Sequence, residues 1–293
     1  MSVFVAEELS EVLNTKVVIG RINMGLLNRI IIDDVLLDDQ SGQEMLKVTR
    51  LSAKFDIMPF FKGKISISSV QLFGFNINLR KETPDSPPNF KFVLDAFASK
   101  DTVKKENSLD LRINSILIRR GRMSYHVLSE EETPGKFNAK HIQLQNIIAN
   151  ISLKALSKDS LNLGIKRLSL DEKASGFSLK KMSLKLVANN KQTNIDNFTI
   201  ELPETSLKLD TIHLEYDSLK AFDRFTEQVH FSFRTLPSQV TLKDISPFVP
   251  ILSHFKEPVT LDMEVKGTVD QLTCSHLEIT ADDRQFRLRG DVS

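Results

Sequence analysis

Tryptophan is absent from this chain of 293 residues, tyrosine occurs twice, and the only cysteine is Cys274. One cysteine cannot form an internal disulfide, and it excludes zinc sites built from several cysteines. The 19 phenylalanines make the aromatic groups almost entirely hydrocarbon, without the polar handle of Tyr and Trp. Cys274 itself stands at an apolar position of a strand pattern, so we expect a small buried side chain there and not a nucleophile.

Glycine is also scarce, with 11 residues, and no two glycines have the G-x-G spacing of nucleotide-binding phosphate loops. Lys and Arg number 39 against 38 Asp and Glu, and this near balance gives no overall attraction to nucleic acid. No segment has the roughly 18 consecutive apolar residues of a membrane-spanning helix. The N-terminus carries Glu7 and Glu8 before an apolar core builds up, so it does not have the form of a signal peptide.

Motifs for catalysis or metal binding are missing as well. The sequence contains no G-x-S-x-G, no P-loop and no H-E-x-x-H, and no two histidines are spaced i, i+4. The acidic pairs Asp33-Asp34 and Asp38-Asp39 flank a short apolar segment, where turn and edge solvation is the simpler interpretation. The run from Glu130 to Glu132 precedes Thr-Pro-Gly and predicts a solvated loop. We expect no enzyme, no metal and no cofactor.

What the sequence does contain is alternation of apolar and polar residues. The segment Val259-Thr-Leu-Asp-Met-Glu-Val265 is typical of a strand with one apolar face. Helical spacing is confined to four short places. These are an amphipathic N-terminal helix within residues 1–15, a helix near 89–99 with Asn89 as its N-cap, and short helices near 218–227 and 244–255.

A longer pattern recurs, in which the apolar residues are spaced as apolar-x-apolar-x-x-apolar-x-apolar. Strict copies start at Leu46, Ile65, Leu163, Phe177, Leu207 and Leu272, where about one copy would arise by chance. Looser copies start at Val17, Ile30, Leu111 and Ile142. The double x would turn the second apolar pair to the opposite face of a strand, and it contains no Gly or Asn for a tight hairpin. A β-bulge, which inserts one residue, restores the facing and is the better interpretation. The double-x pairs that we consider are Ser68-Ser69, Lys166-Arg167, Lys180-Lys181, Asp210-Thr211 and Ser275-His276.

We therefore expect a mainly β protein with long, bulged and twisted antiparallel strands and a few short helices. Roughly 14 to 18 strands exceed the ~10 at which open sheets usually curl or split, and four short helices cannot cover their apolar face. An open groove and a β-sandwich both satisfy this pattern, and the residues alone do not separate them.

Several segments resemble the AsmA-like superfamily, specifically its TamB (translocation and assembly module) type from Bacteroidales. The resemblance is specific over about residues 5 to 128 and looser to the end of the chain. The segments are 9–25 (LSEVLNTKVVIGRINMG), 28–40 (NRIIIDDVLLDDQ), 64–74 (KISISSVQLFG), 87–97 (PPNFKFVLDAF), 110–121 (DLRINSILIRRG), 245–250 (ISPFVP) and 265–270 (VKGTVD).

This resemblance implies a continuous β-groove over residues 16–293 and a bridge-like carrier of phospholipid or another acyl lipid in outer-membrane biogenesis. It also implies a periplasmic location, with an anchor in the inner membrane. Such family chains carry a membrane helix that is missing before Val3 and run much longer, so the resemblance implies the membrane-proximal part of a longer protein. The alternatives are a scaffold that assists insertion or secretion of β-barrel proteins through an Omp85-type partner, and an unrelated soluble β-sandwich.

If the chain carries lipid, we expect the apolar positions of the repeat to contact the acyl chains. The expected lipid-contacting residues are Ile65, Ile67, Val70, Leu72, Leu111, Ile113, Ile116, Ile118, Leu163, Ile165, Leu179, Leu207, Leu209 and Ile212.

Overall fold

The computed structural model describes residues 2–26, 28–55, 67–98, 114–156, 160–281 and 287–292. The chain divides into two compact units. The first comprises Met1–Asn150 and Leu170–Gly176, and the second comprises Ile151–Ser169 and Phe177–Ser293. Ile65, Leu111 and Ile113, which we expected to contact lipid, lie outside the described residues.

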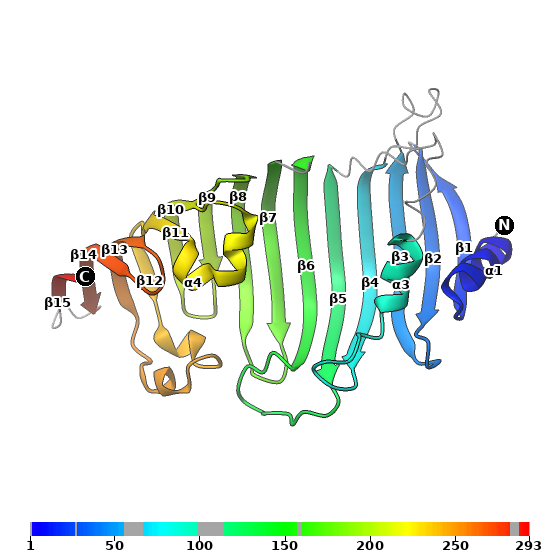
Figure 1. Ribbon diagram of the computed structural model, residues 1–293, viewed down its shortest axis with the longest axis horizontal. Coiled ribbons are helices and arrows are strands. Elements are labelled where there is room, and N and C mark those ends of the chain that lie inside the picture. The colour runs from blue at the N-terminus through cyan, green and yellow to red at the C-terminus, as the bar shows by residue number, and fades with distance from the viewer. Residues whose placement is uncertain are drawn as a thin grey trace. The chain divides into compact units, whose positions relative to one another are not determined.

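The described residues are mainly strand, and the strands follow one another in a single mixed sheet in the order β1 to β11, β13, β14 and β15 (Figure 1). β12 lies off this path and pairs with β10 and β13. The expectation of a mainly β fold with long strands and few helices is confirmed. One sheet takes the place of the two packed sheets that a sandwich requires. The strands are β1 Val17–Gly25, β2 Arg29–Asp38, β3 Glu44–Phe55, β4 Ile67–Lys81, β5 Ser115–Val127, β6 His141–Leu156, β7 Ser160–Glu172, β8 Ser178–Asn189, β9 Gln192–Glu201, β10 Ser206–Glu215, β11 His230–Arg234, β12 Ser238–Val240, β13 Val259–Gly267, β14 Leu272–Ala281 and β15 Arg287–Val292.

The strands are not all antiparallel, and in this respect the sequence-based expectation was wrong. β4 and β5 pair in parallel, with Val70 opposite Ile116 and Leu79 opposite Tyr125. A parallel pair needs a long crossover connection, because the chain must return to the end where the first strand began. Residues 82–114 provide this connection and include the helix α3, Lys91–Ala98.

In the first unit, the double-x steps of neighbouring strands lie opposite one another, at a position along the strands here called the irregular level. The inward apolar residues step by three from Ile19 to Ile22 in β1 and from Ile32 to Val35 in β2, as the double-x pattern requires. Ile19 pairs with Val35 and Ile22 pairs with Ile32, so the register is the same on both sides of the step. We had expected a single inserted residue. Instead, both strands contain the double-x step, and neither has an extra residue relative to the other.

The same level continues through β3, β4 and β5. Asp34, Gly74 and Arg120 at this level have φ angles of 58°, 65° and 55°, in the left-handed region. Asn146 of β6 has a φ angle of 54°. A left-handed residue is a common element of bulged strands, because it redirects the backbone and turns the following side chains to the other face. Because of the irregular level, the apolar residues after it point to the same face of the sheet as the apolar residues before it.

Register shifts of one residue occur where a double-x strand meets a neighbour without a matching step. In β14, Ser275 is the extra residue, since Glu264 pairs with His276 while Val265 pairs with Cys274. This is the bulge that the sequence predicts at Ser275-His276. A bulge also lies at Ser68, between the pairs Lys54–Ser69 and Phe55–Ile67, shown by a shift in register. Between β8 and β9 the register shifts between Ser183 and Lys185. The bulge expected at Lys180-Lys181 stays a prediction.

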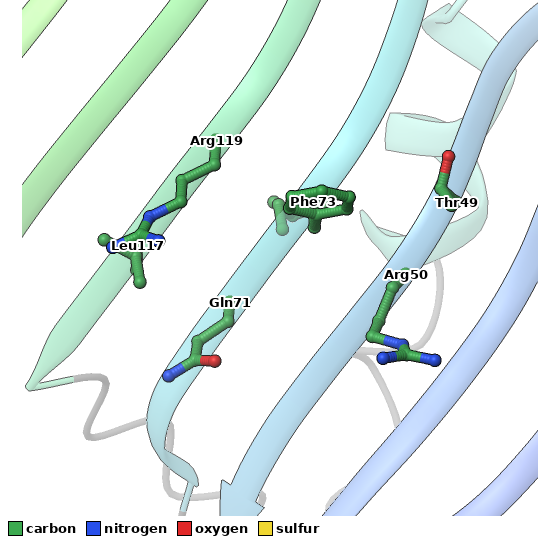
Figure 2. A pocket seen from close by; sticks show the side chains of 7 residues that line it. Thr49, Arg50, Gln71, Phe73, Leu117 and Arg119 are labelled. Atoms are coloured by element: carbon green, nitrogen blue, oxygen red, sulfur yellow. The ribbon is translucent and has the colours of Figure 1, made fainter.

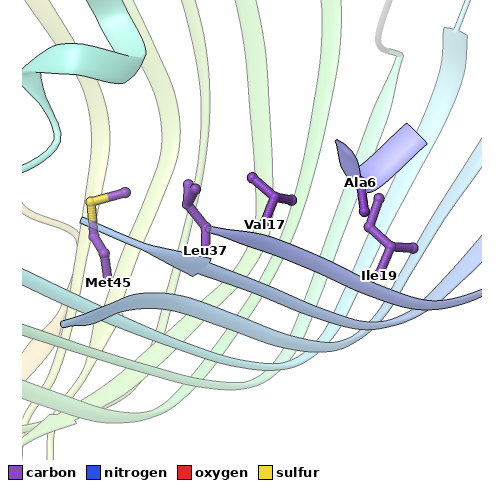
Figure 3. Close-up of a cluster of buried hydrophobic side chains, with 5 residues drawn as sticks. All are labelled: Ala6, Val17, Ile19, Leu37 and Met45. Atoms are coloured by element: carbon purple, nitrogen blue, oxygen red, sulfur yellow. The ribbon is translucent and has the colours of Figure 1, made fainter. Parts of the chain in front are cut away.

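Two α-helices cover part of the apolar face of the first unit. α1 (Ser2–Leu13) places Ala6 against Val17 and Ile19. Val93 of α3 and Phe90, just before that helix, pack against the same cluster. Figure 3 shows Val17, Ile19, Leu37 and Met45 pointing from the strands toward the side on which Ala6 lies. The expected N-terminal and 89–99 helices thus form close to their predicted positions. Asn89 does not cap α3 as expected. Its side chain instead accepts from the Arg80 amide and donates to Asp39 and Asn78.

The helices of the second unit are short. They are η2 (Leu219–Arg224) followed by α4 (Phe225–Gln228), and the 3₁₀ helices η3 (Leu242–Ile245) and η4 (Pro250–His254). Ala221 and Val229 pack with Tyr216 into a small core. The single helix expected near 244–255 is two separate 3₁₀ turns, because Pro247 and Pro250 each lack the N–H that a continuous helix would use.

Candidate functional site

The strongest feature of the first unit is a face made only of apolar residues, here called the apolar face. It consists of four rows that run across β1 to β5, in register from strand to strand. The rows are Met24, Ile30, Ala53, Val70 and Ile116; Ile22, Ile32, Leu51, Leu72 and Ile118; Ile19, Val35, Val48, Phe75 and Gly121; and Val17, Leu37, Leu46, Ile77 and Met123. None of these positions carries a charge or a hydrogen-bonding side chain.

Gly121 is the one position of the rows without a side chain, and the ring of Phe75 fills the space above it. A Cβ atom at Gly121 would lie 2.4 Å from Cζ of Phe75 and 3.0 Å from Cβ of Ile147. The register places Gly121 opposite Phe75, between the pairs Phe73–Arg119 and Asn76–Arg122. The glycine therefore leaves room for the Phe75 ring, which a side chain at position 121 would overlap.

The apolar face is only partly covered. α1 and α3 pack over the cluster of Val17, Ile19, Leu37 and Met45. Among the described residues, a second cluster around Val48, Phe75 and Ile147 consists of strand residues, such as Leu51, Leu72 and Ile118. Throughout the described part of the chain, no Leu, Ile, Met or Phe side chain is less than 2% exposed. The side chains of the second cluster come from one sheet and shield one another.

The opposite face of the same strands, here called the polar face, is charged at the irregular level. Arg21, Asp33, Arg50, Phe73 and Arg119 pair in sequence across β1 to β5. The Asp33 carboxylate accepts a hydrogen bond of 2.7 Å from Nε of Arg50, and it is only 5% exposed. This hydrogen bond and the nearby arginine charges hold the pKa of Asp33 below its usual value, although burial opposes the shift. Asp33 is thus paired and covered, and not solvated as expected.

A shallow depression lies on the polar face beside this row. Figure 2 shows Thr49 and Arg50 on β3, Gln71 and Phe73 on β4, and Leu117 and Arg119 on β5 around it. The Arg120 guanidinium lies over the Phe73 ring, 5.1 Å from its centre, in a cation–π contact. The depression is open and combines Arg50 and Arg119 with the apolar side chains of Phe73 and Leu117, whereas the rows of the apolar face carry no charge.

The structure places several expected lipid-contacting residues on the apolar face. Val70, Leu72, Ile116 and Ile118 are members of its rows, and Ile67 precedes the bulge at Ser68 near the start of β4. Because Val70 pairs with Ile116 and Leu72 with Ile118, the parallel strands bring these four side chains together. The sequence pattern does not predict that these four side chains are adjacent, because the strands were expected to pair antiparallel.

The remaining expected residues lie in the second unit. Leu207 pairs with Ile200, Leu209 with Phe198 and Ile212 with Ile195, which gives β9 and β10 a shared apolar side. Leu179 and Leu209 are buried, at 7% and 8% exposure. The other residues of this group, which are partly exposed, are Leu163, Ile165, Leu207 and Ile212.

Several residues of the rows are not among the expected lipid-contacting residues, for example Ile32, Leu51 and Phe75. The copies of the repeat that start at Ile30 and Leu46 contain the first two, so the signal was present and was not used. The third belongs to Val70-x-Leu72-x-x-Phe75-x-Ile77, which escapes a strict search because Phe73 occupies an x position. Phe73 lies on the polar face, where Arg120 covers it.

Apolar side chains are also exposed on the helices of both units. In α1, Val3 and Phe4 are 66% and 67% exposed. In the second unit, Phe222 of η2, Ile251 of η4 and Phe255 just after η4 are exposed.

Two buried carboxylates fix turns at the ends of the strands in the first unit. Asp39 accepts hydrogen bonds from Ser41, Gln43 and Asn89 and lies 2.7 Å from Arg80. Glu172 accepts from the amides of Gln143, Ala174 and Ser175 and from the Ser175 hydroxyl. Burial alone would raise the pKa of each carboxyl, but these hydrogen bonds outweigh it and lower both pKa values.

One group of titratable side chains lies apart from the apolar face. His126 and His141, which showed no metal-binding spacing in the sequence, meet where β5 and β6 are joined, and Glu132 of the connecting loop lies beside them. Neighbouring strands bring together residues that are 15 apart in the chain, and no local motif reports this.

The sequence matches no protein-family model and no curated protein. None of the helices in the described residues is long and apolar enough to cross a membrane.

Proposed function

We propose that this protein is a lipid carrier whose apolar face holds acyl chains. In this proposal the chain is the membrane-proximal segment of a bridge-like, periplasm-spanning carrier of the AsmA-like, TamB type. It acts in outer-membrane biogenesis and is anchored to the inner membrane. The observation that carries the proposal is the set of four uninterrupted apolar rows, whose central cluster contains strand residues only, within the part of the chain that the structure describes.

The dimensions of the apolar face suit an acyl chain. Five strands at about 4.8 Å spacing give a width of about 19 Å, comparable with the length of an extended fatty acyl chain. Each methylene removed from water would contribute about 0.8 kcal/mol, without a specific polar contact. Because the rows offer no hydrogen-bonding side chain, we expect weak selection among acyl chains. Headgroups would stay in water or at the rim.

The first experiment is native mass spectrometry of the chain purified in a mild detergent. We expect mass additions that correspond to phospholipid or another acyl lipid, and extraction should identify them. Protein that is consistently free of lipid, and that does not take up a fluorescent phospholipid from phosphatidylethanolamine–phosphatidylglycerol vesicles, would contradict the proposal.

The second experiment uses neighbouring residues that point to opposite faces. A photo-crosslinking amino acid at Leu72 or Ile118 should trap lipid, because both residues lie in the apolar rows. The matched controls are Gln71 and Arg119, the sequence neighbours that line the polar depression. Equal lipid capture from both faces would show nonspecific association and would sink the proposal.

A second candidate function is a scaffold for an Omp85-type partner or a client strand. The observation that favours it is the outer edge of β1, which ends the strand order among the described residues. Met24 in β1 and Leu26 just after it are exposed, at 77% and 90%. An unpaired strand edge can accept another strand. Crosslinkers at Val18 and Asn23 that capture protein, while Leu72 captures no lipid, would favour the scaffold.

A further inference from the structure

A histidine pair lies on the first unit at the end of the β5–β6 hairpin, away from the apolar rows. His126 is the penultimate residue of β5, and His141 is the first residue of β6. Their Nδ1 atoms are 3.0 Å apart. Oε1 of Glu132, on the loop between the strands, is 3.9 Å from Nδ1 of His126. The three ligand atoms all lie within 4.8 Å of one another.

The hydrogen bonds around the pair orient His141 as a metal ligand. Its Nε2 atom lies 2.9 Å from the carbonyl oxygen of Glu130. A carbonyl can only accept, so the ring proton lies on Nε2 and a neutral ring directs the Nδ1 lone pair toward His126. Metal-binding histidines usually donate their second N–H to such an oxygen, which fixes the tautomer and the ring orientation.

The charges nearby also favour a cation. The side chain of Glu132 is 61% exposed and free to turn toward the rings. Two basic groups beside the histidines are already paired: Lys140, next to His141 in the chain, lies 2.7 Å from the Glu130 carboxylate, and Arg80, opposite His126 in the sheet, lies 2.7 Å from Asp39. His141 is 6% exposed, so one ligand is held firmly by its surroundings.

We propose that His126, His141 and Glu132 bind a divalent transition-metal ion of the zinc type. Both histidines would bind through Nδ1, and the carboxylate would supply the third ligand. Imidazole and carboxylate are ligands that suit zinc, and three protein ligands leave a fourth position for water. The ion would tie the end of β5, the loop and the start of β6 together. This site is independent of the lipid proposal.

The test is isothermal titration calorimetry of zinc chloride into the full chain after treatment with EDTA. We expect one zinc ion per chain, with a Kd below about 10 µM, where 1 µM corresponds to −8.2 kcal/mol. His126→Ala and His141→Ala should each weaken binding at least about 100-fold, and Glu132→Gln about tenfold. The matched control is His213→Ala, which removes a single histidine bonded to Asn194 and Glu215 and should leave the affinity unchanged.

A second measurement does not depend on variants that fold. Long-range ¹H–¹⁵N spectra of the unsubstituted protein should show the Nδ1 resonances of both histidines shifting on addition of zinc, while the Nε2 atom of His141 stays protonated. Three results would overturn the proposal: no binding at 100 µM zinc, affinity within threefold of the original in the histidine variants, or coordination through Nε2. The pair would then be an N–H···N hydrogen bond only.

Discussion

In β1 to β5 of the first unit, the double-x steps of all five strands lie opposite one another at the irregular level, here also called the matched level. In the second unit, the double-x step of β14 lies opposite β13, which alternates strictly and has no such step. In the first region the pairing keeps one register through the step, and four apolar rows continue across five strands. In the second region Ser275 is the extra residue of a β-bulge, and the register shifts by one residue. The same sequence pattern thus gives a matched level or a bulge, depending on what the neighbouring strand contains.

Deleting one residue from each region should give the largest difference. Deletion of Thr49 would leave β3 without the step that β2 and β4 still carry, so its rows would lose register on both sides. We expect a loss of more than about 4 kcal/mol of stability, or failure to fold. Deletion of Ser275 leaves Leu272-x-Cys274-x-Leu277-x-Ile279, a plain alternation that matches β13.

We expect the second deletion to cost only about 1 kcal/mol, because it removes a bulge and keeps every apolar residue on its face. Urea denaturation followed by circular dichroism, together with hydrogen exchange of peptides from β2–β4 and β13–β15, would measure both variants. Equal costs for the two deletions would show that the matched level has no special role.

Gly74→Ala tests the matched level without changing its length. Gly74 has a φ angle of 65°, and a Cβ atom there would lie 2.7 Å from Oγ1 of Thr49. Backbone strain and overpacking together should cost about 2–4 kcal/mol. Hydrogen exchange in β3 and β4 should quicken more than in β13 and β14. Adding Thr49→Ala should recover the part due to the clash, whereas no recovery would place the whole cost in the backbone.

Glu172→Gln should cost about 2–3 kcal/mol near pH 7, because an amide cannot replace a carboxylate that accepts from four donors. The folded pKa lies below the ordinary 4.5, so the stabilisation is fully present above that pH. It is lost as the pH falls through the folded pKa. The difference between Glu172→Gln and the original chain should therefore shrink below about pH 4. Thermal unfolding between pH 3 and pH 7 would measure it, and a difference independent of pH would refute this account.

Arg50→Ala should have the smallest effect on stability, since the arginine side chain is 56% exposed and the ion pair is screened by solvent. Its main consequence should be a rise in the pKa of Asp33, which loses its strongest hydrogen bond. Carboxyl ¹³C titration would detect this rise, and Arg21→Ala is the weaker control because its nearest oxygen lies 4.0 Å away. An unchanged pKa of Asp33 would show that backbone features set it.

The sequence alone determined the fold class, the apolar positions of each strand and the need for an irregularity at each double x. These features are local, because alternation and a step of three are properties of one strand. The tertiary structure decided whether each step became a bulge or a shared level, since that depends on the neighbouring strand. It also decided that β4 and β5 are parallel, so that Leu72 adjoins Ile118, and that His126 meets His141. Strand pairing over long sequence separations sets such contacts, and no pattern within one segment records its partner.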